Sequence, residues 1–390
     1  MASIVPLKSL ILEAPPSCIE FSALFPDVFV VGTYVLEQTP GHSADATLEN
    51  STPQTRHGEL VYFRLSGDNI TEIHKADTNG AVLDLHFRPI KREEPKDRLC
   101  VATSTGVLEL HDLAASGPQN DRPRKFRVAS SDTLVLSLVW HPNRSDVVAV
   151  TLSTGQVRLC QLTYGPISED IPDIIWQVDL ITHGLEAWTV VFGVDGKCVF
   201  SGGDDGTLRC HSLPDEPDTT AYSASMDQDF LGGDECTRWV DRKAHTAGVT
   251  AILPLLRGVI ITGSYDDKIR IVSSKQFRRQ ILAELNLGGG VWRLKYIEGS
   301  QSSGVAADHA DMRVVVLASC MHAGARIVEI RKQRDDWSID VLARFEEHQS
   351  MNYGSDIQPS KEDGERNIIS TSFYDKLLCL WRWKDDSSKD

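Results

Sequence analysis

Residues 201–213 read SGGDDGTLRCHSL, and this short stretch shows the unit from which most of the chain is built. An apolar strand ends in small residues, a tight turn containing Gly and Asp follows, and a strand of alternating apolar and polar residues leaves the turn. The same form returns in ATSTGVLELHDL (102–113), TLSTGQVRLCQL (151–162), TGSYDDKIRIVSS (262–274), ASCMHAGARIVEI (318–330) and STSFYDKLLCLWRW (370–383). These copies recur about every 50 residues, which is typical of a repeat architecture.

A second apolar strand stands upstream of most copies, as VLDLHF, VLSLVW, AWTVVF, GVTAIL and VWRLKY. One such unit cannot bury its inner face alone, so it must stack on its neighbours around an axis. Closure into a ring then removes the exposed strand edges. A degenerate first copy covers residues 27–37 and 57–65. The pattern predicts an all-β fold, a seven-bladed β-propeller of the WD-repeat class.

We expect one propeller domain over residues 1–390, because all-β rings extend as single domains beyond the usual domain length. The segment LKSLILEA, residues 7–14, is a lone strand, whereas the last repeat lacks an outer strand. We therefore predict that this segment completes the last blade and closes the ring. The predicted blades are, approximately, residues 15–70, 71–113, 124–162, 174–213, 237–274, 281–331 and 339–383.

Composition excludes several classes of function. The formal net charge is -15, and the basic residues are dispersed, so a nucleic-acid surface is not expected. No apolar run approaches the roughly 20 residues needed to span a bilayer. Acidic residues gather at 215–218, at 227–235 and in the C-terminal KDDSSKD, which we interpret as solvated loops. Loop insertions are predicted at 38–56, 215–236 and 299–311.

The 8 cysteines lack paired spacing, which favours buried free thiols in a reducing compartment. The chain has no clear signal peptide, so we expect a cytoplasmic protein, acting as a monomer. Cys100, Cys160, Cys198 and Cys379 stand in apolar strands.

Several histidines stand where WD repeats hold a hydrogen-bonded lock. In such a repeat, a His, a Ser or Thr, a turn Asp and a Trp bond to one another. The sequence places His183 with Asp205, and His245 with Ser264 and Asp266, at these positions; Asp375 and Trp381 match in the last repeat. A structural lock is one interpretation, and a reactive histidine is the other.

The sixth repeat departs from the pattern. Where the fifth has GSYDDK, the sixth has CMHAGA, so that Ala323 replaces the turn Asp while Cys320, Met321 and His322 occupy the turn region. The strand before it opens with GGGVWR, residues 288–293, in which three glycines permit close backbone approach. An irregular loop or ordinary packing would explain the CMHAGA turn or the GGGVWR segment alone. Because both departures occur in one repeat, we interpret them as a functional site.

The motifs SGGDDGTLR, HTAGV, TGSYDDKIRI, GGGVWRLKY, LASCMHAGARI and residues 353–356, in this order, resemble the diphthine methyl ester hydrolase family of WD-repeat proteins. The likeness extends from about residue 28 to residue 383, and its specific part is the set GSYDD, GGGVWR and CMHAG. It implies a carboxylic ester hydrolase that removes the methyl ester from methylated diphthine on elongation factor 2, the protein substrate, during diphthamide synthesis. The resemblance implies no metal and no organic cofactor, and it carries over no catalytic residues.

Ester hydrolysis needs a nucleophile, a base and donors for the oxyanion. His322 is the first candidate for the base, because an imidazole titrates near neutral pH. It would activate water or the nearby thiol of Cys320, which has buried packing as its alternative role. The second candidate base is His245 with Asp266 as its orienting carboxylate. The candidate oxyanion donors are backbone amides in 288–290, foremost those of Gly289 and Gly290.

Diphthine carries a quaternary trimethylammonium group, which aromatic faces and carboxylates recognise. The candidate aromatic residues are Trp292, Tyr265 and Tyr353, and the candidate carboxylates are Asp266, Asp267 and Asp356. Ordinary packing is the alternative for each aromatic residue. A non-catalytic adaptor or a regulatory subunit, the commonest use of such rings, remains the alternative function.

Overall fold

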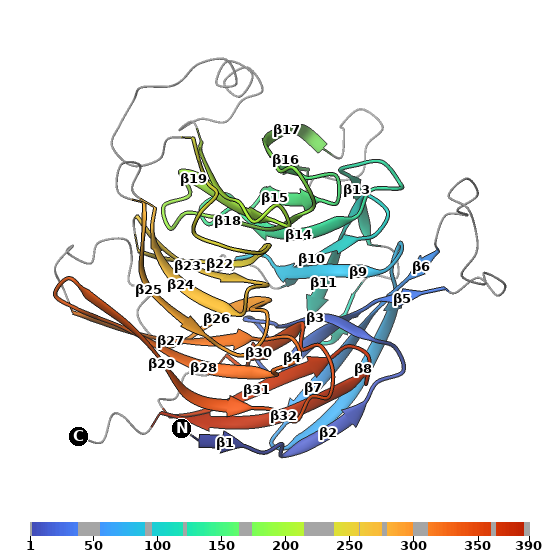
Figure 1. Cartoon of the computed structure of the whole chain (residues 1–390). Helices are drawn as coiled ribbons and strands as arrows, with labels where there is room; N and C mark the ends of the chain where they lie inside the picture. The colour runs from blue at the N-terminus through green and yellow to red at the C-terminus, as the bar shows by residue number, and fades with distance from the viewer. Residues whose placement is uncertain are drawn as a thin grey trace, which may run out of the picture.

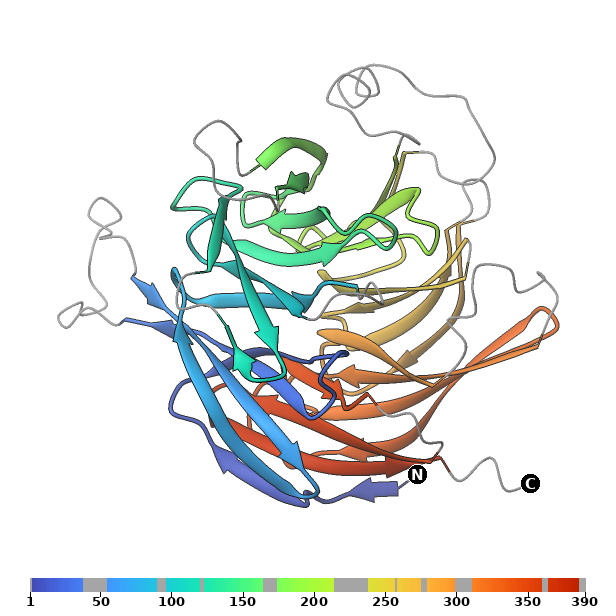
Figure 2. The ribbon, with the colours of Figure 1, turned by 180° about the vertical axis from the view of Figure 1, so that it is seen from behind.

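Seven sheets of four or five strands stand around a common axis in the computed structural model (Figure 1). The structure describes residues 2–37, 55–89, 96–119, 123–163, 174–213, 238–256, 258–274, 279–298, 311–359 and 364–385. Within these ranges every regular element is a strand, and no helix capable of crossing a membrane is found. The predicted seven-bladed propeller is confirmed, and the view from behind shows the same ring (Figure 2).

The innermost strands form the wall of the axial channel. Each contacts the innermost strand of the next blade, and the seventh contacts the first, which closes the ring. From blade 1 to blade 7 they are β3 (Pro16–Phe21), β9 (Val82–Phe87), β14 (Val135–Trp140), β18 (Ala187–Phe192), β22 (Val249–Leu256), β26 (Arg293–Glu298) and β30 (Gly354–Ile357).

Each blade continues outward by antiparallel pairing, with a small hairpin of β5 (Val35–Leu36) and β6 (Arg56–His57) beside blade 1. The outer strands, blade by blade, are β4 (Val28–Thr33), β7 (Glu59–Ser66) and β8 (Asn69–Asp77); β10 (Asp97–Thr103), β11 (Val107–Ala114), β12 (Gly117–Pro118) and β13 (Arg124–Arg127); β15 (Val147–Leu152), β16 (Gln156–Leu162) and β17 (Ile174–Thr182); β19 (Cys198–Gly203), β20 (Leu208–Ser212) and β21 (Trp239–Asp241); β23 (Val259–Ser264), β24 (Lys268–Ser273) and β25 (Gln280–Asn286); β27 (Met312–Ser319), β28 (Ala325–Gln333) and β29 (Asp336–Phe345); β31 (Glu365–Ser372) and β32 (Leu377–Lys384).

The N-terminus fastens two blades. Strand β2 (Lys8–Ile11) pairs antiparallel with β32 and supplies the missing outer strand of blade 7, as predicted. Strand β1 (Ala2–Ile4) pairs parallel with β29 of blade 6, a contact that the sequence did not reveal because the segment has only 3 residues. Figure 1 shows both blue strands beside the red and orange C-terminal blades.

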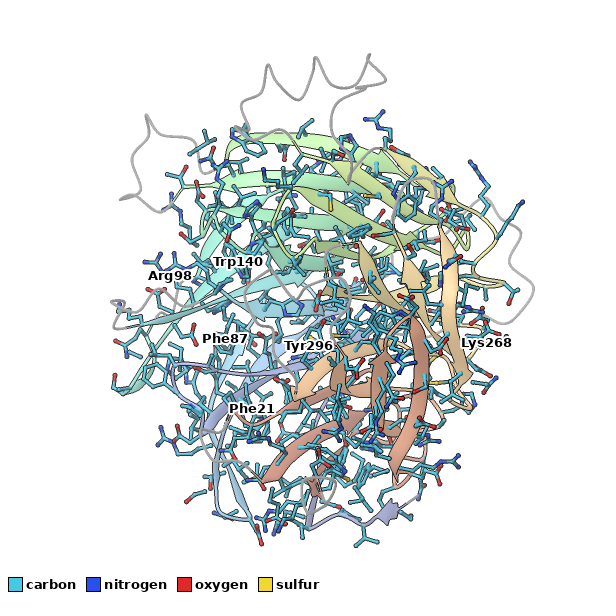
Figure 3. The ribbon with its side chains drawn as sticks, turned by 90° about the vertical axis from the view of Figure 1, so that its left-hand side faces the viewer. Phe21, Phe87, Arg98, Trp140, Lys268 and Tyr296 are labelled. Atoms are coloured by element: carbon cyan, nitrogen blue, oxygen red, sulfur yellow. The ribbon has the colours of Figure 1, made fainter. Side chains whose placement is uncertain are left out.

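The core lies between neighbouring blades, where alternate residues of the strands are buried. At the junction of blades 6 and 7, the rings of Phe345 and Trp381 stack with centroids 4.8 Å apart, and both side chains are fully buried. The 7 described cysteines are free and buried, as expected. Aromatic residues end the inner strands of blades 1 to 3, where Phe21, Phe87 and Trp140 are buried (Figure 3).

Three blades contain the histidine lock. His183 Nε2 lies 2.8 Å from Ser201 Oγ, while its Nδ1 lies 3.0 Å from Asp205 Oδ1. In the last blade, His348 Nε2 lies 2.7 Å from Ser370 Oγ, to which the Trp381 indole donates a hydrogen bond of 2.9 Å. These bonds connect the loop before each inner strand to the second strand of its own blade, so the histidines act as architecture.

The predicted loop insertions fall almost wholly outside the described residues, as do the acidic runs 215–218 and 227–235 and most of the C-terminal KDDSSKD.

Candidate functional site

One end of the ring carries a continuous run of aromatic side chains, which we call the aromatic arc: Trp188, Tyr265, Trp292, Tyr353 and Phe373. Trp188 and Trp292 have ring centroids 5.6 Å apart, and Tyr265 lies 5.9 Å from Trp292. The arc continues from Trp292 to Tyr353 at 5.0 Å and from Tyr353 to Phe373 at 5.6 Å. Three predicted aromatic residues, Tyr265, Trp292 and Tyr353, therefore come together.

The backbone explains this gathering. Trp188 is the second residue of its innermost strand, and Trp292 and Tyr353 stand just before the first residue of theirs, whereas Tyr265 and Phe373 follow the second strand of their blades. In a propeller, both positions lie at the same end of the ring, close to the axis. All five side chains are half-buried, unlike the buried aromatic residues at the other ends of the inner strands. The arc therefore leaves ring surface open to a ligand.

Carboxylates accompany the arc. The indole of Trp188 donates a hydrogen bond of 3.0 Å to Asp204 Oδ1, and Asp204 is exposed. Burial raises the pKa of Tyr265, and the nearby Tyr353, Asp204 and Glu186 add to that rise. This end of the channel is thus aromatic with a negative potential, which suits a cation.

The irregular turn of blade 6 packs beside the arc. A Cβ added to Gly290 would lie 2.8 Å from Met321 Sδ and 3.5 Å from Tyr265 Cα. On its other side the turn meets blade 7, because the Asn352 amide donates a hydrogen bond of 3.1 Å to the Met321 carbonyl. Met321 has a φ of 44°, a left-handed conformation that is uncommon for a residue other than glycine.

His322 stands on this turn with an exposed side chain. No hydrogen bond or ion pair joins its ring to any part of the chain that the structure describes, so both ring nitrogens are open to water or a ligand. The amides of Gly289 and Gly290 likewise have no acceptor among the described residues. The structure therefore brings His322, both glycines and the arc to one end of the ring.

Cys320 is placed differently from His322, although only one residue separates them. Its side chain is fully buried and its Sγ lies 3.7 Å from the Ala318 carbonyl. Burial raises the pKa of its thiol to about 12. The thiolate that nucleophilic attack requires is therefore scarce at neutral pH, and this geometry favours the packing role.

The predicted hydrogen bond between His245 and Asp266 is not formed. His245 Nε2 lies 2.9 Å from Thr262 Oγ1, in the manner of His183 and its serine, and not against Ser264. Burial and the charge of Arg270 lower the pKa of His245 to about 4.

Asp266 instead forms a close ion pair with Arg270. One of its oxygens lies 2.8 Å from Arg270 Nη2 and the other lies 2.9 Å from Nη1. Burial opposes its ionisation, but the bonds to Arg270 and to the Thr246 amide outweigh burial and lower its pKa to about 2. His245 thus belongs to the histidine lock, and Asp266 belongs to a separate ion pair. The two residues do not form a base and its orienting carboxylate.

Asp356 also differs from expectation. It is buried below the arc, where its Oδ1 lies 2.9 Å from Lys295 Nζ and its Oδ2 accepts a hydrogen bond of 2.6 Å from the Phe21 amide. Both oxygens are therefore occupied, so that Asp356 offers no free carboxylate to a substrate.

Asp356 belongs to a set of charged side chains on four innermost strands, which we call the axial network: Glu20, Asp84, His86, Arg293, Lys295 and Asp356. His86 Nδ1 lies 2.5 Å from Glu20 Oε2, and its Nε2 lies 3.5 Å from Asp84 Oδ1. Arg293 Nη2 lies 2.9 Å from Asp84 Oδ1. The network contains three carboxylates and three groups that can be cationic.

The pKa of His86 is raised to about 9. Burial acts in the other direction, but the charges of Glu20 and Asp84 outweigh it. The pKa of Glu20 is lowered in turn, since His86 and Lys295 outweigh its burial. His86 is therefore protonated near neutral pH, where it pairs with the carboxylates of Glu20 and Asp84.

The axial network as a set, Trp188 and Phe373 were not predicted from the sequence. Signals for the network and for Trp188 are nevertheless present in the inner strands: VLDLHF contains Asp84 and His86, VWRLKY contains Arg293 and Lys295, and AWTVVF has its Trp where VWRLKY has Trp292. Charged residues within otherwise apolar inner strands could have indicated the axial network.

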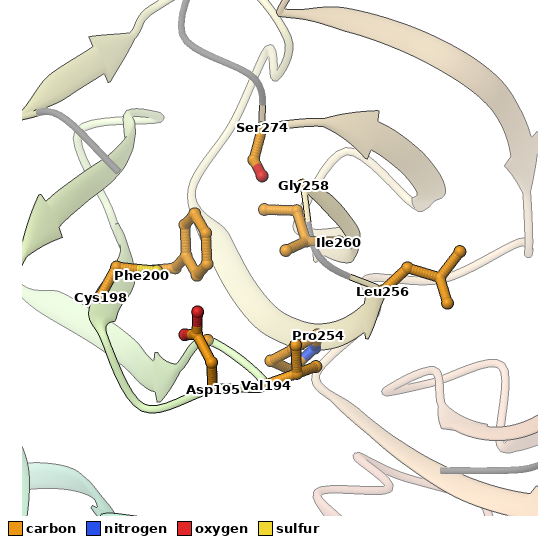
Figure 4. A pocket seen from close by; sticks show the side chains of 10 residues that line it. Val194, Asp195, Cys198, Phe200, Pro254, Leu256, Gly258, Ile260 and Ser274 are labelled. Carbon is orange, nitrogen blue, oxygen red and sulfur yellow. The ribbon is translucent and has the colours of Figure 1, made fainter. Parts of the chain in front are cut away.

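A separate shallow hollow lies between blades 4 and 5, away from the arc (Figure 4). Cys198, Phe200, Pro254 and Ile260 are among the residues that line it, together with the turn at Asp195. None of the predicted site residues takes part in it. Among the described residues no group of three or more His, Cys, Asp or Glu side chains is arranged to hold a metal ion.

Fold and repeat together define a WD-repeat propeller. The family model described as "WD domain, G-beta repeat" matches residues 177–212, and a chain in a crystal structure of the mitotic checkpoint complex shares the fold with a TM-score of 0.62 over 99% of this chain and 94% of that chain, at 14% identity.

Within this class, sequence relatives identify the family. The chain is 30% identical to the diphthine methyltransferase of Schizosaccharomyces pombe, over 97% of this chain and 98% of that protein. It is 25% identical to the protein of that name from Saccharomyces cerevisiae, over 96% and 97%, and 26% identical to the one from Homo sapiens, over 83% and 68%. The chain belongs to the diphthine methyltransferase family.

Proposed function

We propose that this protein acts in diphthamide biosynthesis as a carboxylic ester hydrolase, which removes the methyl ester from methylated diphthine on elongation factor 2. The observation that carries the proposal is the aromatic arc, because a propeller that only held its blades together would bury these rings. Membership of the family supports the pathway, and the arc supports the chemical form of the ligand.

The arc fits a trimethylammonium group. Such a cation has no N–H to donate, so it is bound by aromatic faces within about 6 Å of a ring centroid. Trp292 lies at the centre of the arc, in contact with Trp188, Tyr265 and Tyr353. The exposed Asp204 adds attraction at longer range. This arrangement would hold the modified histidine by its charged end.

His322 and the glycine amides supply the chemistry in this proposal. A water molecule attacks the ester carbonyl carbon while His322 accepts its proton, and the amides of Gly289 and Gly290 donate to the oxygen that becomes negative. The bond to the methoxy oxygen then breaks, His322 returns the proton to that oxygen, and methanol leaves. The new carboxylic acid releases its proton to solvent, and the free carboxylate departs. Because Cys320 is buried, direct attack by water is favoured over a covalent thioester.

The test is incubation of the purified protein with elongation factor 2 that carries methylated diphthine. Loss of the mass of one CH₂ group supports the hydrolase. Unchanged mass with binding retained would favour an adaptor or regulatory subunit.

Variants of the arc and of the turn then test the residues. Trp292→Ala is expected to weaken binding and turnover, while Tyr265→Phe, which keeps the ring, is the matched control. His322→Gln is expected to lower kcat with little effect on KM. Full turnover by a folded His322→Gln variant would remove His322 from the mechanism.

A further inference from the structure

The axial network meets the aromatic arc at one residue, Arg293. It is the first residue of β26 and directly follows Trp292, so their Cα atoms are about 3.8 Å apart. Trp292 contributes its ring to the arc, while the side chain of Arg293 reaches Asp84 on β9. Blade 7 and blade 1 lie between blades 6 and 2, so this ion pair crosses the channel.

Asp84 fixes the position of the guanidinium. Its side chain is 1% exposed, and its Oδ2 accepts a hydrogen bond of 2.9 Å from the Leu138 amide of blade 3. Its Oδ1 accepts a hydrogen bond of 3.0 Å from the Leu85 amide and also faces Arg293. A carboxylate held by two backbone amides leaves little freedom to the arginine that pairs with it.

Arg293 retains donors for a ligand. A guanidinium has five N–H groups, and Asp84 is its acceptor among the described residues. The side chain is 22% exposed, so its remaining N–H groups are accessible from the channel. Lys295 differs from Arg293, because it lies 2.9 Å from Asp356 and 3.7 Å from Glu20 and is thus engaged by two carboxylates.

We propose that Arg293 binds the ester carbonyl oxygen of the substrate and then the product carboxylate, so that arc and arginine together form a site for α-trimethylammonio carboxyl groups. This inference rests on the proposed function and extends it. In diphthine the ammonium and the carboxyl group are attached to the same carbon, which requires an aromatic surface beside a cation. Arg293 contacts the reacting group, and Asp84 is a positioning residue.

The chemistry of Arg293 suits this role. Arginine binds a carboxylate through two parallel N–H···O bonds, and the same donors stabilise the oxyanion that precedes it. The product is a zwitterion, so it adds no net charge to the channel. The site should therefore hold the product as well as the ester.

Three small probes separate the two halves of the site. Trimethylglycine has both groups, choline has the ammonium without the carboxylate, and 3,3-dimethylbutanoate has the carboxylate without the positive charge. Binding to the full chain is measured by ligand-observed NMR. We expect trimethylglycine to bind best, Arg293→Met to lose trimethylglycine while it keeps choline, and Trp292→Ala to weaken both.

Equal trimethylglycine binding by wild type and Arg293→Met would overturn the inference, as would no binding to wild type. Arg293→Lys keeps a positive charge opposite Asp84, so it serves as the control for misfolding caused by loss of that charge. It is expected to keep choline binding and to lower kcat on the ester by about tenfold or more, since one point charge replaces a fork of donors. Full kcat in Arg293→Lys contradicts the proposed contact.

The outcomes distinguish this inference from the proposed function. Arg293-dependent binding of trimethylglycine without ester hydrolysis would leave the site standing and remove the hydrolase. Hydrolysis that does not depend on Arg293 would leave the hydrolase standing and remove this site.

Discussion

Cys320 and His322 show how far a motif can predict chemistry. The sequence marked both as unusual, and they are separated by one residue, yet the fold buries the thiol and exposes the imidazole. Residues at this spacing share a face only in a regular strand. Here the turn at Met321, with its positive φ, separates them.

Cys320→Ser is expected to retain turnover. The pKa of the buried thiol is raised to about 12, so it does not supply a thiolate at neutral pH. Steady-state hydrolysis of the ester on elongation factor 2 checks this, with a thermal melt of the same sample as the control for folding. A large loss of kcat in a well-folded variant would instead restore the covalent route.

His86 is expected to make stability depend on pH in the alkaline direction. Its folded pKa of about 9 lies above the ordinary value of 6.5, so its contribution is complete below pH 6.5 and is lost as pH rises through 9. Denaturant unfolding at a series of pH values measures the effect against His86→Gln, which cannot titrate. If the free energy of unfolding changed with pH in the same way for the two proteins between pH 6.5 and 9.5, the result would contradict the ion pairs of His86 in the axial network.

At the scale of elements, Gly289 and Gly290 pack closely against the turn of blade 6 that carries His322. A Cβ on Gly289 would collide with the Cys320 carbonyl and lie 2.8 Å from Ala323 Cβ, whereas a Cβ on Gly290 would meet the flexible side chain of Met321. Gly289→Ala is therefore expected to displace the turn that carries His322 and lower kcat, with Gly290→Ala as the milder control. The two variants showing equal kcat would argue against this placement of the turn.

The N-terminal strands should stabilise the ring. Deletion of residues 1–14 removes β1 and β2 and exposes the edges of β29 and β32. We expect the melting temperature to fall by more than about 5 °C, which corresponds to a loss of a few kcal/mol in a chain of this size. Deletion of residues 1–5, which removes only β1, should have the smaller effect. An unchanged melt after the longer deletion would contradict closure by β2.

The elements themselves were largely predictable from sequence. Period-two alternation and the turn residues locate the strands, and the missing outer strand of the last repeat points to the N-terminus. The partner of His245 was not predictable, because Thr262 and Ser264 lie on the same side of one strand. Only the register against β22 decides which hydroxyl meets the ring.

At the scale of the whole molecule, the site arises from ring closure. Glu20 and Asp356 are 336 positions apart, counted as 356 − 20, yet Lys295 lies within 3.7 Å of the first and 2.9 Å of the second. Such proximity requires blade 7 to lie beside blade 1, which no local pattern specifies. The aromatic arc was partly predictable from sequence, because Trp292, Tyr265 and Tyr353 were among the candidate residues, whereas Trp188 and Phe373 were not.

We propose that ester hydrolysis takes place at the end of the ring that carries the aromatic arc. The most direct measurement is the intact mass of elongation factor 2 bearing methylated diphthine, before and after incubation with the purified protein. Our proposal predicts loss of one CH₂ group with wild type and a much slower loss with Trp292→Ala. An unchanged mass with folded wild-type protein would contradict it.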